Sequence, residues 1–170
     1  MNYTKYYYLE SYLFAEVAQT FRMNGYLAPE EFFAIVIWKA NRAKTTVKRK
    51  LTKGGRDLAS SVKNLTQQIQ TATTDEDKLR ILVDDWQFRL PMATAILTVL
   101  YPERFSVYDV RVREQLGIKD FVDHKGQVDR YFREFLPKVQ AEGKGETLRD
   151  KDRYLWGKSW HEDLQKLVQT

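Results

Sequence analysis

The stretch that most constrains the fold is an apolar run between two prolines, PMATAILTVLY, which spans residues 91–101 and is followed by Pro102. Its side chains are apolar on nearly every side of a helix, and such a helix is buried inside a protein. Proline is well tolerated in the first turn of a helix, whereas a proline further along ends one. The run therefore predicts a short central helix around which the rest of the chain packs.

Most of the remaining chain carries the apolar spacing and the end signals of helices. Gly25 ends the first segment, and Thr74 with three acids behind it is a strong signal for a helix start. The predicted helices span residues 2–24, 29–44, 56–70, 74–90, 91–101, 110–117, 127–140 and 148–168. Pro137 can cut one of them near its end, and RFSVY, residues 104–108, is the segment that could be extended. The pattern predicts a single all-α domain over residues 1–170.

The composition narrows the possible chemistry. The chain has 170 residues, of which 43% are hydrophobic, enough for one domain with a core. It has no cysteine, which excludes disulfides, thiolate metal sites, iron–sulfur clusters and cysteine nucleophiles. The two histidines, His124 and His161, are too far apart in sequence to suggest a local metal pair, so each is expected at the surface. Phosphate-loop and dinucleotide motifs are absent as well, and we expect neither a metal nor a cofactor.

The sequence also bears on location. No stretch of eighteen consecutive apolar residues is present, so no membrane span is expected. The first residues mix Lys5, Glu10 and Glu16 with aromatic side chains, unlike the apolar core of a signal peptide. The expected location is therefore the cytoplasm.

Positive charge is concentrated in one part of the chain. Residues 38–63 contain nine Lys or Arg and one Asp, which gives this basic segment a net charge of +8 within a chain of +5. The remainder is slightly acidic. A basic segment on such a chain suits a polyanionic partner, although a solvated surface that keeps the protein soluble accounts for it equally well.

The stretch ERFSVYDVRVREQLG, residues 103–117, places one acid between a short apolar run and a helix. Asp109 immediately precedes the predicted helix, where a carboxylate can accept free backbone N–H groups. The short link from Pro102 brings the chain back toward the central helix, so Asp109 is expected at the edge of the core. From the residues alone two roles stay open for it, a helix cap that is acidic by chance and a reacting group.

A longer stretch around this acid, LPMATAILTVLYPERFSVYDVRVREQL, resembles the helix–hairpin–helix DNA glycosylase superfamily. In that family a helix of the form TAxAIL is followed by a short turn, an apolar pair and the catalytic Asp. Two further stretches, FFAIVIWKANRAK and LRDKDRYLWGKSW, resemble the smaller bacterial proteins grouped with 8-oxoguanine glycosylases. The three stretches together run from Phe32 to Trp160, so the resemblance spans most of the chain.

The resemblance implies a two-lobed helical domain of the glycosylase type, which binds double-stranded DNA as a monomer. Its hairpin and catalytic-acid region is residues 84–117. The implied activity is that of a monofunctional DNA glycosylase, which hydrolyses the bond between deoxyribose and a damaged or modified base flipped out of the duplex. At the position of the family's catalytic acid, Asp109 would stabilise the oxocarbenium-like sugar cation and position the attacking water.

The same resemblance suggests which side chains meet the DNA. The pocket for a flipped base is expected to be aromatic, and its candidate residues are Trp38, Trp86, Phe88, Tyr108, Tyr154 and Trp156. The phosphates are expected to meet basic side chains, with Arg42, Lys44, Lys48, Arg49 and Lys50 in the basic segment and Arg89 and Arg111 nearer the acid.

The sequence departs from the family at two points. The family's hairpin is usually LPGVG, whose glycines let the backbone approach a phosphate, whereas the corresponding residues here are DWQFRLP. Arg89 could replace that contact with its side chain, and the start of the Pro91 helix could still favour a phosphate. Family members that also cut the strand carry a lysine two residues before the position of Ala93, where this chain has Pro91. A Schiff-base step by that route is excluded, and Lys39 is the candidate for a displaced amine.

Other interpretations remain beside this one. The chain could be a non-catalytic DNA-binding module on the same fold, or a helical protein-interaction module that binds no nucleic acid. Trp38 and Trp156 could be core residues rather than stacking platforms. The acid pairs Asp84–Asp85 and Asp150 with Asp152 are explained by helix-terminus and solvent roles.

Overall fold

The computed structural model describes residues 3–121 and 126–169, and within these ranges every regular element is helical. The prediction of an all-α chain is thereby confirmed. None of the helices in the described ranges combines the length and the apolar character needed to cross a membrane.

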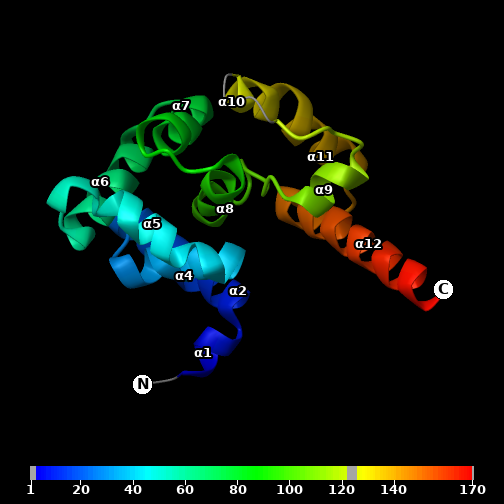
Figure 1. Cartoon of the computed structure of the whole chain (residues 1–170), viewed down its shortest axis with the longest axis horizontal. Coiled ribbons are helices and arrows are strands. Elements are labelled where there is room, and N and C mark those ends of the chain that lie inside the picture. The colour runs from blue at the N-terminus through cyan, green and yellow to red at the C-terminus, as the bar shows by residue number, and fades with distance from the viewer. Residues whose placement is uncertain (1–2, 122–125, 170) are drawn as a thin grey trace.

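The helices follow one another with short connections, as Figure 1 shows. The first half contains α1 (Thr4–Tyr7), α2 (Leu9–Tyr12), the π-helical segment η1 (Leu13–Val17), α3 (Ala18–Asn24), α4 (Pro29–Ala40), the 3₁₀ turns η2 (Asn41–Ala43) and η3 (Lys53–Gly55), α5 (Lys44–Leu51) and α6 (Leu58–Thr71). The second half contains α7 (Asp75–Arg80), π-helical η4 (Ile81–Asp85), α8 (Leu90–Leu100), α9 (Val110–Gln115), α10 (Gln127–Arg130), π-helical η5 (Tyr131–Phe135), α11 (Leu136–Glu142) and α12 (Leu148–Val168).

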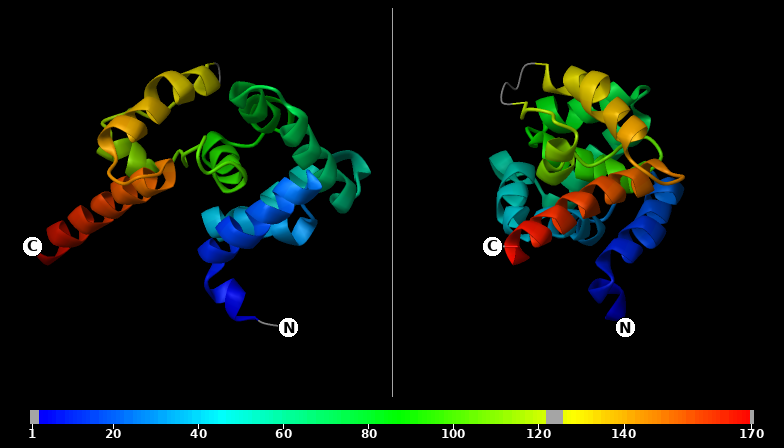
Figure 2. Two further views of the ribbon diagram at one scale, coloured as in Figure 1. Left: turned by 180° about the vertical axis from the view of Figure 1, so that it is seen from behind. Right: turned by 90° about the vertical axis from the view of Figure 1, so that its right-hand side faces the viewer.

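Helix α8 forms the centre of the molecule, as its apolar sequence predicts. Every residue of α8 other than Pro91 is buried. Helices α2 to α6 gather on one side of α8, whereas α9 to α12 lie on the other (Figures 1 and 2). The central helix therefore joins the two groups of helices.

The link between α8 and α9 begins with a turn at residues 102–104 and forms no strand, and polar contacts hold its second half from both sides. The Thr94 hydroxyl accepts a hydrogen bond from the Tyr108 amide at 2.9 Å. The buried Tyr131 hydroxyl accepts one from the Ser106 amide at 2.9 Å and donates one to the Ser106 carbonyl at 2.7 Å. Because these contacts satisfy the buried backbone of the link, they fix where Asp109 emerges from the core.

Several predicted helix ends differ from the observed ones. The helix predicted over 2–24 is interrupted at Tyr8, whose ψ of 51° is not helical. The helix predicted over 29–44 stops at Ala40, whose φ of −162° is extended, and Lys44–Leu51 forms a separate helix. Pro137 does not cut its helix, because it lies in the first turn of α11, just after a π-helical segment, and proline is tolerated in a first turn.

Other predicted ends agree with the structure. At α7 the Thr74 hydroxyl accepts from the Asp77 amide at 3.0 Å, and Asp77 reaches back to Thr74, which is a capping box. Thr147 and Asp150 form the same arrangement at the start of α12. The helix-terminus role predicted for Asp150 is confirmed.

Candidate active site

A cavity of about 500 Å³ lies where the two groups of helices face each other beside the link. Side chains from α2, α4, the link, α9 and α12 line it, namely Glu10, Trp38, Lys39, Val107, Asp109, Val110, Arg111, Arg149, Asp152, Arg153 and Trp156. We refer to it as the Asp109 cavity. Its lining combines three acids, four basic side chains and two indole rings, and its volume lies in the usual range for a ligand site.

Asp109 is the N-cap of α9 and is held there by its own side chain. Its Oδ1 accepts a hydrogen bond from the Arg111 amide at 3.0 Å. The side chain keeps 18% of its surface exposed, so it is neither sealed in the core nor free in solvent. The capping role is thus observed, and the same carboxylate also faces the cavity.

The second oxygen of Asp109 meets an amine from a distant part of the chain. Lys39 Nζ donates to Asp109 Oδ2 across a separation of 70 residues. Lys39 comes from the last turn of α4, and its side chain is 15% exposed. A carboxylate and a primary amine therefore lie together at the edge of the cavity.

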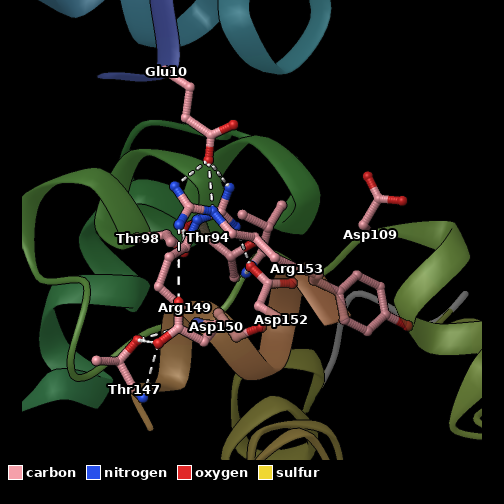
Figure 3. A network of polar contacts seen from close by, with 12 residues as sticks. Glu10, Thr94, Thr98, Asp109, Thr147, Arg149, Asp150, Asp152 and Arg153 are labelled. Atoms are coloured by element: carbon pink, nitrogen blue, oxygen red, sulfur yellow. Dashed lines mark hydrogen bonds and ion pairs between the residues drawn. The ribbon is translucent and has the colours of Figure 1, made fainter. Parts of the chain in front are cut away.

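A second polar cluster joins side chains of α2 and α12 that line the cavity, and Figure 3 shows its contacts. Arg149 donates to Asp152 Oδ2 and, at 2.6 Å, to Glu10 Oε1. Arg153 also donates to Glu10 Oε1, at 2.9 Å. The cluster ties the N-terminal helices to α12 across 139 residues of sequence and lies apart from Asp109 in the view of Figure 3.

The pKa values of the two carboxyl groups of this cluster, Asp152 and Glu10, are shifted in opposite directions. Burial raises the pKa of Asp152 above its usual value, and the nearby Arg149 opposes that rise. Partial burial acts in the same direction on Glu10, but hydrogen bonds and charges from Arg149 and Arg153 outweigh it and lower its pKa. Of the two carboxyl groups, Asp152 lies in the more buried environment, because its side chain is only 2% exposed.

Two indole rings form part of the cavity wall. The guanidinium of Arg149 lies 5.4 Å from the centroid of the Trp38 ring, and Trp38 packs edge-on against Phe14 with ring centroids 5.8 Å apart. On the other side, Arg111 lies 5.7 Å from the Trp156 ring, which is 43% exposed. Both rings are placed to contact a flat ligand in the cavity.

Four of the six aromatic residues predicted for a base pocket do not line the Asp109 cavity. Trp86 is buried in the core, where its Nε1 donates to Gln68 Oε1 at 2.9 Å, and Phe88 is buried beside Phe32. Tyr108 stacks on Phe121 with centroids 4.9 Å apart, and burial raises its pKa to about 12. Tyr154 is half-buried and packs against the core. These four rings pack in or against the core, because apolar rings next to a core gain free energy by burial.

Most of the predicted phosphate contacts lie on the surface. Arg42, Lys44, Lys48, Arg49 and Arg89 are exposed, Lys50 and Arg111 are half-buried, and Lys44 donates to Asn41 at 2.9 Å. Arg111 also lines the cavity and pairs with Asp163 at 2.6 Å. The basic residues predicted to contact phosphates therefore extend from the α5 surface to the edge of the cavity.

The turn at residues 86–89, between η4 and α8, has a defined geometry. Gln87 adopts a left-handed φ of 59° without being glycine, and its carbonyl accepts a hydrogen bond from Lys50. The Phe88 amide closes the turn by donating to the Leu82 carbonyl at 2.8 Å. Burial and the charges of Arg89 and Arg49 lower the pKa of Lys50. Lys50 thus serves to hold the turn, and Arg89 remains exposed beside it.

Sequence reasoning missed the polar cluster of Glu10, Arg149, Asp152 and Arg153. The solvent role predicted for Asp152 is wrong, because this side chain is buried. A signal was present in the sequence. Asp152 falls on the apolar stripe of α12, whose buried positions are Leu148, Asp152, Leu155 and Ser159, and an acid on a buried stripe needs a partner. Arg149, three residues earlier on the same face, is that partner.

Nothing in the described ranges suggests a metal centre. No group of three or more potential acidic or histidine ligands is brought together among these residues. His161 is exposed, as predicted, and His124 lies outside the described residues. The charged groups that line the Asp109 cavity are carboxylates, one amine and guanidinium groups.

Comparisons of the chain with models of protein families, with curated proteins and with solved structures find no match.

Proposed function

We propose that this protein is a monofunctional DNA N-glycosylase, built as the two-lobed helical domain of the helix–hairpin–helix type. The observation that carries the proposal is the position of Asp109, a partly exposed carboxylate at the edge of a cavity with two indole rings in its wall. Basic side chains on α5 and around the cavity support a polyanionic substrate. The proposed reaction releases one base from DNA and leaves an abasic site.

The proposed chemistry needs one carboxylate near the sugar. As the bond from C1′ to the base nitrogen breaks, its electron pair leaves with the base and positive charge develops on the sugar. Asp109 stabilises that cation and accepts a hydrogen bond from the water that attacks C1′. The water loses a proton, the departing base gains one, and the products are the free base and the abasic sugar. Trp38 and Trp156 hold the flipped base by contact with its faces.

The amine of Lys39 allows a test of whether hydrolysis is the whole reaction. A primary amine in place of water would form a Schiff base at C1′, and borohydride would reduce that adduct to a stable bond. We expect no borohydride-trapped protein–DNA complex, because Lys39 is engaged by Asp109. The measurement is gel electrophoresis after reduction of a reaction mixture. A complex formed by the wild type and absent with Lys39→Gln would instead assign a lyase step to Lys39.

The basic surface of α5 leads to a prediction about affinity. Changing Lys44, Lys48 and Arg49 together to Gln is expected to weaken duplex binding uniformly across sequences. The slope of log affinity against log salt should fall by about 0.9 for each phosphate that the variant no longer neutralises. Fluorescence anisotropy over a range of salt concentrations measures this. A matched triple change of the exposed residues Arg22, Arg133 and Lys144 to Gln removes the same charge elsewhere and should leave the slope closer to that of the wild type.

A second candidate function is a DNA-binding module without turnover. The observation in its favour is that both oxygens of Asp109 are already engaged, one by the α9 backbone and the other by Lys39. A screen of duplexes with damaged and modified bases distinguishes the two, because a module would give no abasic product while salt-dependent affinity persists. A protein-interaction role is favoured if the α5 substitutions leave DNA binding unchanged.

A further inference from the structure

The acid–arginine pair in the Asp109 cavity has no part in the hydrolysis proposed above. Asp152 accepts from the Arg149 guanidinium, and the Val107 amide nitrogen lies 3.5 Å from the same oxygen. The Arg149 guanidinium and the Val107 amide are both N–H donors, so the Asp152 oxygen that they face accepts from them. The side chains of Asp152 and Arg149 are 2% and 14% exposed, yet both reach the cavity. A buried acceptor and a buried donor thus lie side by side where a ligand would sit.

Arg149 has donor capacity left over. A guanidinium carries five N–H groups, and the Nε of Arg149 is buried without a hydrogen-bond partner among the described residues. The hydrogen bonds to Asp152 and Glu10 use one N–H on each terminal nitrogen of Arg149, so each of these nitrogens keeps a second N–H that can donate to an acceptor in the cavity. Glu10 holds the other terminal nitrogen of the guanidinium, and the centroid of the Trp38 ring lies 5.4 Å from it. The donor is therefore fixed in position before any ligand arrives.

We propose that Asp152 and Arg149 read the pairing edge of the flipped base and select bases of the cytosine or adenine type. This inference rests on the proposed function and names its substrate class. Cytosine and adenine derivatives carry an amino group next to an unprotonated ring nitrogen. The amino group donates to Asp152, and the ring nitrogen accepts from the Arg149 guanidinium.

The same pair of contacts rejects the deaminated bases. Uracil and hypoxanthine derivatives, and guanine derivatives too, have a carbonyl oxygen where the amino group stands and a protonated ring nitrogen beside it. With the base held in the same orientation, the carbonyl would then face the Asp152 carboxylate and the N–H would face the guanidinium. Both contacts become unfavourable, and a site built around buried polar groups discriminates strongly in such a case.

Matched duplexes test this selection directly. Each carries one modified nucleotide, hydroxymethylcytosine or hydroxymethyluracil, opposite an abasic-site analogue, so that pairing with the other strand does not differ. Base release is measured in single turnover, and affinity is measured with Asp109→Asn, in which leaving-group ability plays no part. We expect the Asp109→Asn protein to bind the hydroxymethylcytosine duplex at least about tenfold more tightly than the hydroxymethyluracil duplex. Adding Asp152→Asn, whose amide can donate, should abolish or reverse that preference. Asp84→Asn removes an exposed carboxylate outside the cavity lining and is the matched control.

The outcomes separate this inference from the proposed function. Equal affinity of Asp109→Asn for the two members overturns the inference, even if Asp152→Asn does not fold. If the wild type releases bases, and the ratio of release from the cytosine and uracil duplexes is the same in Asp152→Asn, the protein is a glycosylase but Asp152 does not select the base. A binding preference that depends on Asp152, without release from any duplex, supports the subsite and refutes the catalytic proposal.

Discussion

Asp109→Asn is expected to slow base release by about 10²–10⁴-fold in single turnover while the protein still binds duplex DNA. Asparagine is nearly the same size, and its side-chain oxygen can still accept from the Arg111 amide as an N-cap, so α9 should remain in place. The substitution removes the negative charge that would face the sugar cation, together with the ion pair to Lys39. The measurement is abasic-site formation on a duplex that the wild type processes, with affinity determined in parallel.

A matched control for this substitution exists elsewhere in the chain. Asp57 is also an N-cap, at α6, where it accepts from the Ser60 amide at 2.8 Å, but it does not line the Asp109 cavity. Asp57→Asn makes the same chemical change at the same kind of position and should leave the release rate unchanged. An Asp109→Asn protein as active as the Asp57→Asn protein would refute the catalytic assignment.

Local signals in the sequence predicted the positions of many helices and the burial of α8. The capping box at Thr74 depends on neighbours within three residues, and the burial of α8 depends on eleven consecutive residues. Such signals act within a helical turn or two, so they can be read without knowing the fold. Asp109 belongs to this class too, because its place before α9 made a capping role visible in advance.

The composition of the Asp109 cavity depended on packing that no local pattern contains. Lys39 meets Asp109 across 70 residues, and Glu10 meets Arg149 across 139. Only the arrangement of α2, α4 and α12 around the link brings these groups together. Aromatic residues were the least predictable, since a ring such as Trp86 can serve a core or a ligand equally well. Its burial followed from contacts with α6, which includes Gln68.

Besides its hydrogen bonds, the link that carries Asp109 should be stabilised by one buried ring, Phe105. Its ring has no exposed surface and packs against Tyr101, Tyr131 and Phe132 with centroids 6.1 to 6.5 Å away. Phe105→Ala removes these contacts and leaves a cavity between the link and η5. The expected loss is about 3–5 kcal/mol in the free energy of unfolding, which is a large share of the stability of a domain this size.

Urea unfolding followed by circular dichroism measures this loss, and the dependence on urea concentration should keep the same slope. Met23→Ala, on α3, is the control, because Met23 is 69% exposed and alanine favours a helix. Its free energy of unfolding should stay within about 0.5 kcal/mol of the wild type. A Phe105→Ala loss as small as that would mean that the link is anchored by its hydrogen bonds to Thr94 and Tyr131 alone. In that case Asp109 would depend on polar contacts of the backbone, and Thr94→Val would displace it more than Phe105→Ala does.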